Sequence, residues 1–568
     1  MTRRAVVATT LVWAFALFFS LATYTFSDDH FGRISPARQI ARYGELPFRD
    51  FFDPGYFMTE VASASVQRLL GDNLLGEMLL TSLFVAGGAL AIVLLVRRAT
   101  GSLRLACVTA IVAVLAFRRP YDYDKFLFYP LGLLACWRYG DSRRIRDLMV
   151  IALVAAVATM FRYDNGLFVA AGAFALIAAV HAGESARVVQ RVGLFIGACV
   201  LCMTPYVLFL QANVGLGEAV GQMTTYARRE GARTRIATLP RGALSEIHVT
   251  WLPPPQPHES WRRRLRRHVP LGTASVSWGA AGAAAVAYYL FVALSVAATV
   301  TVMRVRNTGR SLERGRVLSA VSMTLLAIIL VLREPVIARI GGMIGPPAVL
   351  GAWMWYRSAP SPRATTSAKA TAVKAARGWH LMRLAVAVCA LATMMVATEW
   401  RSSLSLVRRN GSLLTRLADA TASPPSTTML PKPRLRGLVD YLRRCTRPDD
   451  RVFAAWFVPE LYFFAGRAFA GGMVETFGDH WSEPDHQQRI VEKMKAESVP
   501  LVLVREGDES FSRGYPMVAE YLGAHYRTAG SSAFGGTDGG RYTVLTRTDR
   551  PMTGIDTATS MPCFATQT

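Results

Sequence analysis

Apolar segments recur along the first 400 residues, and they constrain the fold more than any other feature of the chain. A run of roughly 20 apolar residues can cross a bilayer as a helix, and shorter runs can cross where neighbouring protein surrounds them. Hydrophobic residues make up 52% of the 568 residues, which excludes an ordinary soluble protein of this length. We therefore predict a polytopic α-helical membrane protein with about eleven spans, at 5–26, 76–96, 105–117, 126–137, 148–161, 166–182, 192–213, 274–303, 317–332, 341–356 and 381–399.

Arginines alternate with the apolar segments and set the expected topology. The net charge of +25 would also suit a nucleic-acid-binding protein, but the arginines lie beside apolar segments. This pattern indicates the positive-inside rule and contact with membrane lipid, so no nucleic-acid partner is expected. The N-terminus is expected in the cytoplasm of a plasma (inner) membrane protein. The other expected cytoplasmic segments are 97–104, 138–147, 183–191, 304–316 and 357–380, and the expected outer segments are 27–75, 118–125, 162–165, 214–273, 333–340 and the residues after 400.

The chain is expected to divide into a membrane domain, a linker and a small extracytoplasmic α/β domain. These are residues 1–400, 401–430 and 431–568. The outer loop 214–273 breaks the charge rule, because it contains the arginine-rich run WRRRLRRH, and we expect those arginines to face phosphate. In the last domain, helical spacing falls at 435–445, 459–465 and 487–496, and β-rich runs fall at 451–457 and 499–504. Cys445 and Cys563 lie there and could pair if the domain is extracytoplasmic.

Two adjacent acids, Asp28 and Asp29, follow the first span directly. Each charge disfavours the other, and both lie close to hydrocarbon. A carboxylate in such a place suits a general base that takes a proton from a hydroxyl. The alternative is structural, because Ser27 to Asp29 could cap a helix that starts near His30. Helical spacing with apolar faces at 34–42 and 57–70 predicts helices that lie along the membrane interface.

This first outer loop resembles that of the GT-C superfamily of polytopic glycosyltransferases, most closely the protein O-mannosyltransferase type. That type has an Asp-Glu pair followed shortly by His-Phe-Gly, and later Phe-Phe-Asp and His-Pro-Pro. This chain has DDHFG at 28–32 and FFDPG at 51–55, and its ARYGELPFRDFF at 41–52 is similar to a stretch in bacterial members. It departs in having a second aspartate, a His-Phe one residue closer and no His-Pro-Pro.

The resemblance implies a GT-C fold and an inverting sugar transfer from a polyprenyl-phosphate carrier. The acceptor would be a hydroxyl of a glycan, lipid or protein at the outer face of the membrane. Asp28 or Asp29 would deprotonate that hydroxyl, and cations would neutralise the leaving phosphate. No cofactor is identified, and a divalent metal stays open, because Asp28, Asp29 and His30 offer oxygen and nitrogen ligands.

Three further charged turns supply the remaining candidates, at 118–126, 161–166 and 333–342. Arginine suits phosphate, since it is always charged and can bind two oxygens at once. Each turn also fits a structural role, as an interfacial anchor or as a buried ion pair that holds a hairpin. The expected contacts of the donor phosphate are Arg333, Arg162, Arg118, Arg119 and Lys125, and the expected supporting residues are His30, Asp53, Tyr123, Asp124 and Asp164.

Two other classes of function stay open. A polytopic transporter or flippase for a lipid-linked sugar would show inverted repeats and broken spans at matching positions, and the sequence has neither. A membrane-anchored sensing or structural protein would place its function in 431–568 and would tolerate the loss of both Asp28 and Asp29.

Overall fold

The computed structural model describes residues 2–117, 120–233, 278–304, 311–333, 337–358, 413–477, 479–535 and 540–565, without the side chains of 231–233, 278–288 and 330–339. The chain forms two compact units. Unit 1 comprises Met1–Thr23, Thr81–Thr204 and Thr234–Asn410, and unit 2 comprises Tyr24–Leu80, Pro205–Arg233 and Gly411–Thr568. The division into 1–400, 401–430 and 431–568 stays a prediction.

The described part of unit 1 consists of helices that follow the predicted spans. The span at 381–399 and residues 274–277 lie outside the described residues, and the described part of each other span is largely helical. Among the described residues, four helices are long and apolar enough to cross a membrane, namely α1 (Arg3–Thr23), α4 (Leu75–Thr100), α8 (Tyr163–Val180) and α9 (Ser185–Asn213). The chain is therefore a multi-pass membrane protein. The other helices are α5 (Leu103–Ala116), α6 (Tyr123–Ser142), α7 (Ile145–Phe161), α13 (Trp278–Arg304), α14 (Ser311–Arg333), α15 (Ile337–Gly342) and α16 (Gly345–Arg357).

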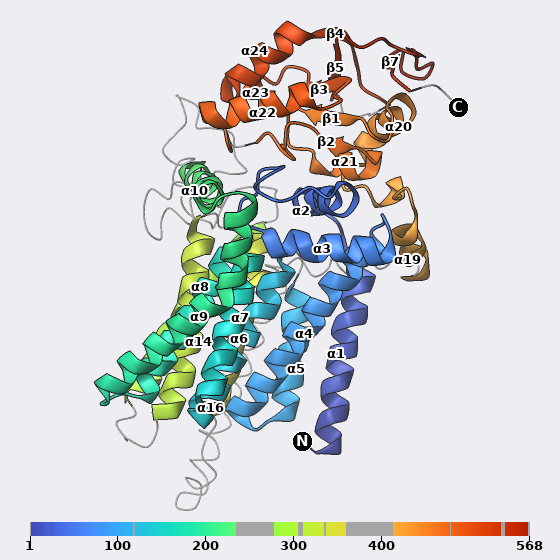
Figure 1. Cartoon of the computed structure of the whole chain (residues 1–568). Helices are drawn as coiled ribbons and strands as arrows, with labels where there is room; N and C mark the ends of the chain where they lie inside the picture. Colours follow the sequence, from blue (N-terminus) through green and yellow to red (C-terminus); the bar gives the residue numbers. More distant parts are fainter. Residues whose placement is uncertain are drawn as a thin grey trace, which may run out of the picture. The chain divides into compact units, whose positions relative to one another are not determined.

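Glycines bring the central helices of unit 1 close together. Helices α6, α7, α8 and α14 pack side by side (Figure 1). A Cβ atom at Gly132 of α6 would lie 2.6 Å from the side chain of Val169 on α8. A Cβ atom at Gly172 of α8 would lie 2.9 Å from the sulfur of Met323 on α14. Small residues at these contacts allow the close backbone approach that is typical of helices in membranes.

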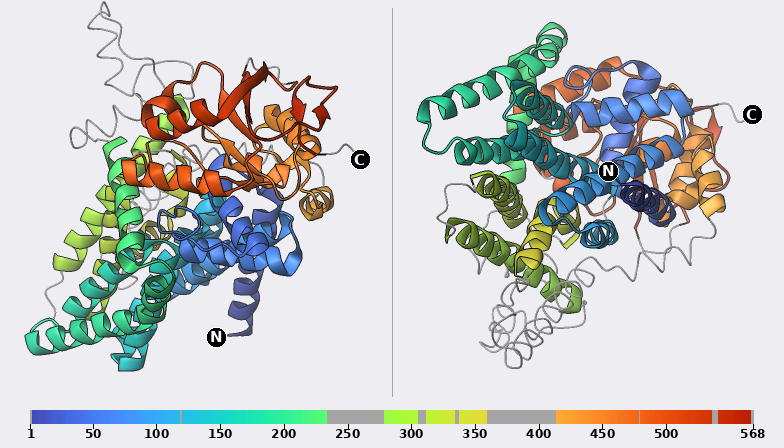
Figure 2. Two further views of the ribbon diagram at one scale, coloured as in Figure 1. Left: turned by 45° about the horizontal axis from the view of Figure 1, so that its top comes forward. Right: turned by 90° about the horizontal axis from the view of Figure 1, so that it is seen from below.

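Unit 2 contains a five-stranded sheet in the order β2-β1-β3-β5-β4. Strand β1 (Arg451–Ala454) pairs in parallel with β2 (Ala468–Phe469) and β3 (Leu501–Arg505), whereas β5 (Tyr542–Arg547) pairs antiparallel with β3 and with β4 (Tyr526–Ser532). Helices accompany the sheet (Figure 2). They are α20 (Arg436–Cys445), α21 (Pro459–Ala465), α22 (Pro484–Ala496), α23 (Ser510–Gly514) and α24 (Pro516–His525).

The first outer loop and the C-terminal region share one hydrophobic core within unit 2. Phe52 of the loop packs with Phe453, Trp481 and Val502, and its ring stacks on that of Trp481 at 5.3 Å between centroids. The loop helices are α2 (Asp28–Arg38), the π-helix η1 (Gln39–Tyr43) and α3 (Phe57–Leu70), and the unit also contains α10 (Leu216–Arg233) and α19 (Leu413–Thr421).

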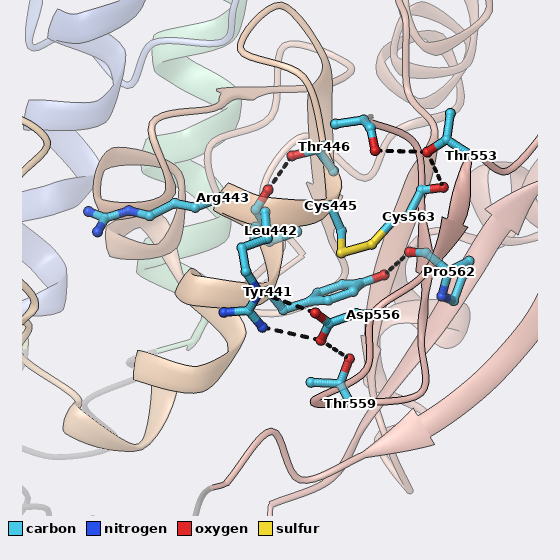
Figure 3. The surroundings of a disulfide bond; sticks show 12 residues. Tyr441, Leu442, Arg443, Cys445, Thr446, Thr553, Asp556, Thr559, Pro562 and Cys563 are labelled. Atoms are coloured by element: carbon cyan, nitrogen blue, oxygen red, sulfur yellow. Dashed lines mark hydrogen bonds and ion pairs between the residues drawn. A yellow bond between two sulfur atoms is a disulfide. The ribbon is translucent and has the colours of Figure 1, made fainter. Parts of the chain in front are cut away.

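Cys445, at the end of α20, forms a disulfide with Cys563 of β7 (Pro562–Cys563), as Figure 3 shows. The hydroxyl of Tyr441 donates to the carbonyl oxygen of Pro562 at 2.7 Å beside it. The pairing that the sequence left open is therefore present. A bridge between residues 118 positions apart restricts the unfolded chain and so stabilises this end of unit 2.

Candidate functional site

Asp28 and Asp29 form the first turn of α2. Ser27 is the N-cap, and its hydroxyl oxygen accepts from the N–H of His30 at 3.3 Å. The helix thus begins earlier than the predicted 34–42, because this cap satisfies a free backbone N–H group. The positive end of the helix dipole favours both carboxylates. Asp28 is half-buried and Asp29 is exposed, so the first turn of the capped helix also carries acids that solvent can reach.

Lys432 connects Asp28 to Glu460. Its Nζ atom lies 2.9 Å from Oδ2 of Asp28 and 3.1 Å from Oε1 of Glu460, which is fully buried on α21. Burial opposes the charged form of Lys432, but the carboxylates of Glu460 and Asp28 outweigh it and raise the pKa of the lysine. Burial also raises the pKa of Glu460, against the effect of the lysine. We therefore assign Lys432 as a charged ammonium between the two acids.

His30 belongs to a different, buried network. Its Nε2 atom lies 2.8 Å from Oε1 of Glu77, and its Nδ1 atom lies 3.4 Å from the hydroxyl oxygen of Tyr24. Ser63 donates to Oε2 of Glu77 at 2.6 Å. Both ring nitrogens are engaged in this way, so His30 supports α2 and does not join Asp28 as a metal ligand in this structure.

Asp53 and Glu60 are two more buried acids of the first loop. Oδ1 of Asp53 accepts from the N–H groups of Gly55 and Tyr56, each at 2.7 Å. Burial raises the pKa of Asp53 to about 6, although these two bonds and the charge of Arg33 oppose the rise. Burial and the charge of Asp53 also raise the pKa of Glu60. Arg33 lies over the ring of Tyr56, with 4.4 Å from Cζ to the ring centroid.

The raised pKa of Asp53 predicts a stability that falls as the pH rises. Between pH 3.8, the ordinary pKa of an aspartate, and about pH 6, the folded chain keeps a proton that the unfolded chain loses. The two-unit shift corresponds to about 3 kcal/mol at neutral pH. Asp53→Asn keeps an oxygen for both N–H groups and removes the charge. Its melting temperature in detergent should equal that of the wild type near pH 4 and exceed it near pH 8, and an equal difference at both pH values would contradict this assignment.

The described residues of the turns at 118–126 and 161–166 meet within unit 1. Nζ of Lys125 lies 2.6 Å from Oδ1 of Asp122, and the side-chain amide of Asn165 donates to Oδ2 of Asp124 at 2.8 Å. All four side chains are buried. A Cβ atom at Gly342 of α15 would lie 3.2 Å from Cβ of Asp122, so this helix covers the ion pair.

The remaining predicted residues of unit 1 have separate environments. Nε of Arg162 lies 2.8 Å from Oδ1 of Asp164, at the start of α8. Tyr123 is fully buried, and its ring meets that of Phe84 edge-on. The described cations of the predicted phosphate site, Arg162 and Lys125, therefore each pair with a nearby carboxylate. Arg118 and Arg119 lie outside the described residues, and Arg333 ends α14 with its side chain outside them.

Potential metal ligands come together at one place in the described part of the chain. Cys445, Asp556 and Cys563 offer ligand atoms within 4.8 Å of one another. The two cysteines are joined in the disulfide, so they cannot ligate as thiolates. The structure thus gives no support to a metal at this cluster.

Sequence reasoning missed four residues of these networks: Lys432, Glu460, Glu77 and Asn165. Lys432 lies in the sequence Pro431-Lys432-Pro433 at the start of the expected C-terminal domain, and Glu460 lies in a segment predicted only as a helix. A buried carboxylate needs a nearby cation or hydrogen-bond donors, which is the one signal that could have pointed from Glu460 to a basic partner.

Comparison with known proteins finds similarity at the level of structure. No protein-family model matches the sequence, and no curated protein matches it. A similar solved structure is that of ArnT from Cupriavidus metallidurans bound to undecaprenyl phosphate. It has 13% sequence identity and a TM-score of 0.50, and the match covers 96% of this chain and 98% of that chain.

The chain has the fold of ArnT. The match extends over both units, so it includes the C-terminal region. The number of membrane spans stays a prediction, since 381–399 lies outside the described residues.

Proposed function

We propose that this chain is a membrane glycosyltransferase that moves a sugar from a polyprenyl-phosphate carrier to a hydroxyl acceptor. The observation that carries the proposal is the ArnT fold over 96% of the chain, because that neighbour was solved with undecaprenyl phosphate. The acidic first turn of α2 supports it further. Asp28 and Asp29 occupy the loop in which GT-C enzymes, to which this loop is similar, place their acidic motif.

In the proposed reaction, Asp28 accepts the proton of the acceptor hydroxyl while the hydroxyl oxygen attacks the anomeric carbon of the sugar. A new carbon–oxygen bond forms as the bond from that carbon to the carrier phosphate breaks, and the electron pair leaves with the phosphate. The configuration at carbon inverts. We favour Asp28 as the base because Lys432 fixes its carboxylate, whereas Asp29 is exposed. The proposed phosphate contacts remain Arg162, Lys125, Arg333, Arg118 and Arg119.

The reaction is proposed to occur outside the cytoplasm. The disulfide between Cys445 and Cys563 supports this side, because such bonds persist in oxidising compartments. The arginine-rich segments on the opposite ends of the predicted spans agree with it. Acceptor choice is proposed to depend on 214–273 and 431–568, of which 234–273 lies outside the described residues.

A deletion strain tests the proposal. Mass spectrometry of envelope glycans, lipids and glycoproteins should show the loss of one sugar and the accumulation of its lipid-linked donor, because the last transfer is blocked. The wild-type gene should restore the modification. Purified protein should also bind undecaprenyl phosphate, used as the probe, in native mass spectrometry. Identical glycan profiles with and without the gene would overturn the proposal.

A further inference from the structure

Lys432 is held in place more firmly than an ordinary surface lysine. Proline precedes and follows it, and proline restricts both its own backbone and that of the residue before it. Its Nζ atom lies 5.6 Å from the ring centroid of Phe457, within the range of a cation–π contact. The ammonium is thus presented at a fixed place between Asp28 and Glu460.

The two carboxylates depend on this one ammonium to different degrees. Glu460 is fully buried, and neither of its oxygens has a hydrogen-bond partner among the described residues besides its ion pair with Lys432. Asp28 is 34% exposed and lies at the start of α2. One positive charge therefore lies between two negative charges, and of the two acids only Asp28 is exposed to solvent. The negative charge of Glu460 therefore offsets part of the favourable effect of the lysine on ionised Asp28.

We propose that Lys432 is a positioning residue that holds the carboxylate of Asp28 in the orientation for proton abstraction, with Glu460 as the buried anchor of the lysine. The inference rests on the proposed function, in which Asp28 is the base. When Asp28 takes the acceptor proton, Lys432 remains charged and keeps its ion pair with Glu460. The C-terminal region then supplies a residue to the reaction centre itself, besides its expected role in acceptor choice.

Further acids lie near α2 among the described residues. Asp29 is adjacent on α2 and is exposed. One turn further along the helix, Oε2 of Glu475 would lie 3.8 Å from a Cβ atom at Gly32. Glu475 in turn lies 3.5 Å from Nδ1 of His480. These acids add negative charge near α2, where Lys432 forms its ion pair with Asp28.

Removing the charge of Lys432 and removing that of Glu460 should move the pH dependence of transfer in opposite directions, and this gives a test. Lys432→Gln removes the positive charge beside Asp28, so the acid limb of the transfer-rate profile should move to higher pH by about one to two units. Glu460→Gln removes a competing negative charge, so the acid limb should move to lower pH. Lys432→Arg keeps the charge and should stay close to the wild type. The rate is that of the product identified with the deletion strain, measured in membrane vesicles.

A double variant guards against misfolding. Lys432→Gln leaves Glu460 buried without its cation, which could unfold the region. Lys432→Gln with Glu460→Gln removes both charges, and its acid limb should still lie at higher pH than that of Glu460→Gln alone. Equal profiles for these two variants would overturn the role of Lys432.

A second measurement needs no activity. A carbodiimide labels protonated carboxyl groups, and peptide mass spectrometry of the full chain in detergent reports the labelling of Asp28 against pH. The labelling midpoint should rise in Lys432→Gln and fall in Glu460→Gln. Shifted midpoints with no transfer by the wild type would support the link and overturn the proposed function. Unchanged midpoints beside normal wild-type transfer would overturn the link and leave the proposed function standing.

Discussion

Asp28→Asn is expected to reduce sugar transfer by about 10²- to 10⁴-fold, the usual contribution of a general base. The amide has nearly the same shape as the carboxylate but cannot accept a proton from the acceptor. The fold should survive, because Ser27 still caps α2 and Lys432 keeps its contact with Glu460. The rate is measured as product formed in membrane vesicles, with the amount of protein in the membrane determined by immunoblot.

Asp29→Asn is the matched control. It lies on the same turn, changes charge by the same amount and is exposed, so transfer should change little. If Asp29→Asn removes transfer and Asp28→Asn does not, the base is Asp29. If the variant with both Asp28→Ala and Asp29→Ala transfers sugar at the wild-type rate, neither acid is the base, and the third class of function, a sensing or structural protein, gains support.

Elements with a strong local signal were predictable from the sequence. The predicted helix at 57–70 is α3, because the helical spacing of its apolar residues marks one face. The predicted helix at 459–465 is α21. The apolar period alone placed the start of α2 at 34, because capping residues carry no apolar period. The alternative in which Ser27 to Asp29 cap a helix that starts near His30 came close to the observed start at Asp28.

The partners of the candidate site were not predictable, because they are long-range contacts. Asp28 meets Lys432 and His30 meets Glu77 only after the chain has folded. The predicted topology placed the two charged turns of unit 1 on the same side of the membrane, yet the bond from Asn165 to Asp124 needs the atomic packing of α6 and α8. The sequence indicated which charged residues would be unfavourable to bury alone, and the structure shows the partners of those that it describes.

Lys125→Met is expected to destabilise unit 1 by about 3–5 kcal/mol, the usual effect of removing one partner from a buried ion pair. The side chains of Lys125 and Asp122 are 4% and 2% exposed, and methionine fills a similar volume without the charge. Asp122 would then lose its ammonium partner in a region of low polarity. Thermal unfolding in detergent measures the change. Lys495→Met, at an exposed lysine, should leave the melting temperature almost unchanged.

The double variant Asp122→Asn with Lys125→Met separates stability from donor binding. It removes both charges of the pair, so most of the lost stability should return. If Lys125 contacts the carrier phosphate, the double variant should be stable but should bind undecaprenyl phosphate more weakly than the wild type in native mass spectrometry. If the lysine only neutralises Asp122, binding should return together with stability. The latter result would leave Arg162, which pairs with Asp164 at the next turn, as the phosphate contact to test among the described cations.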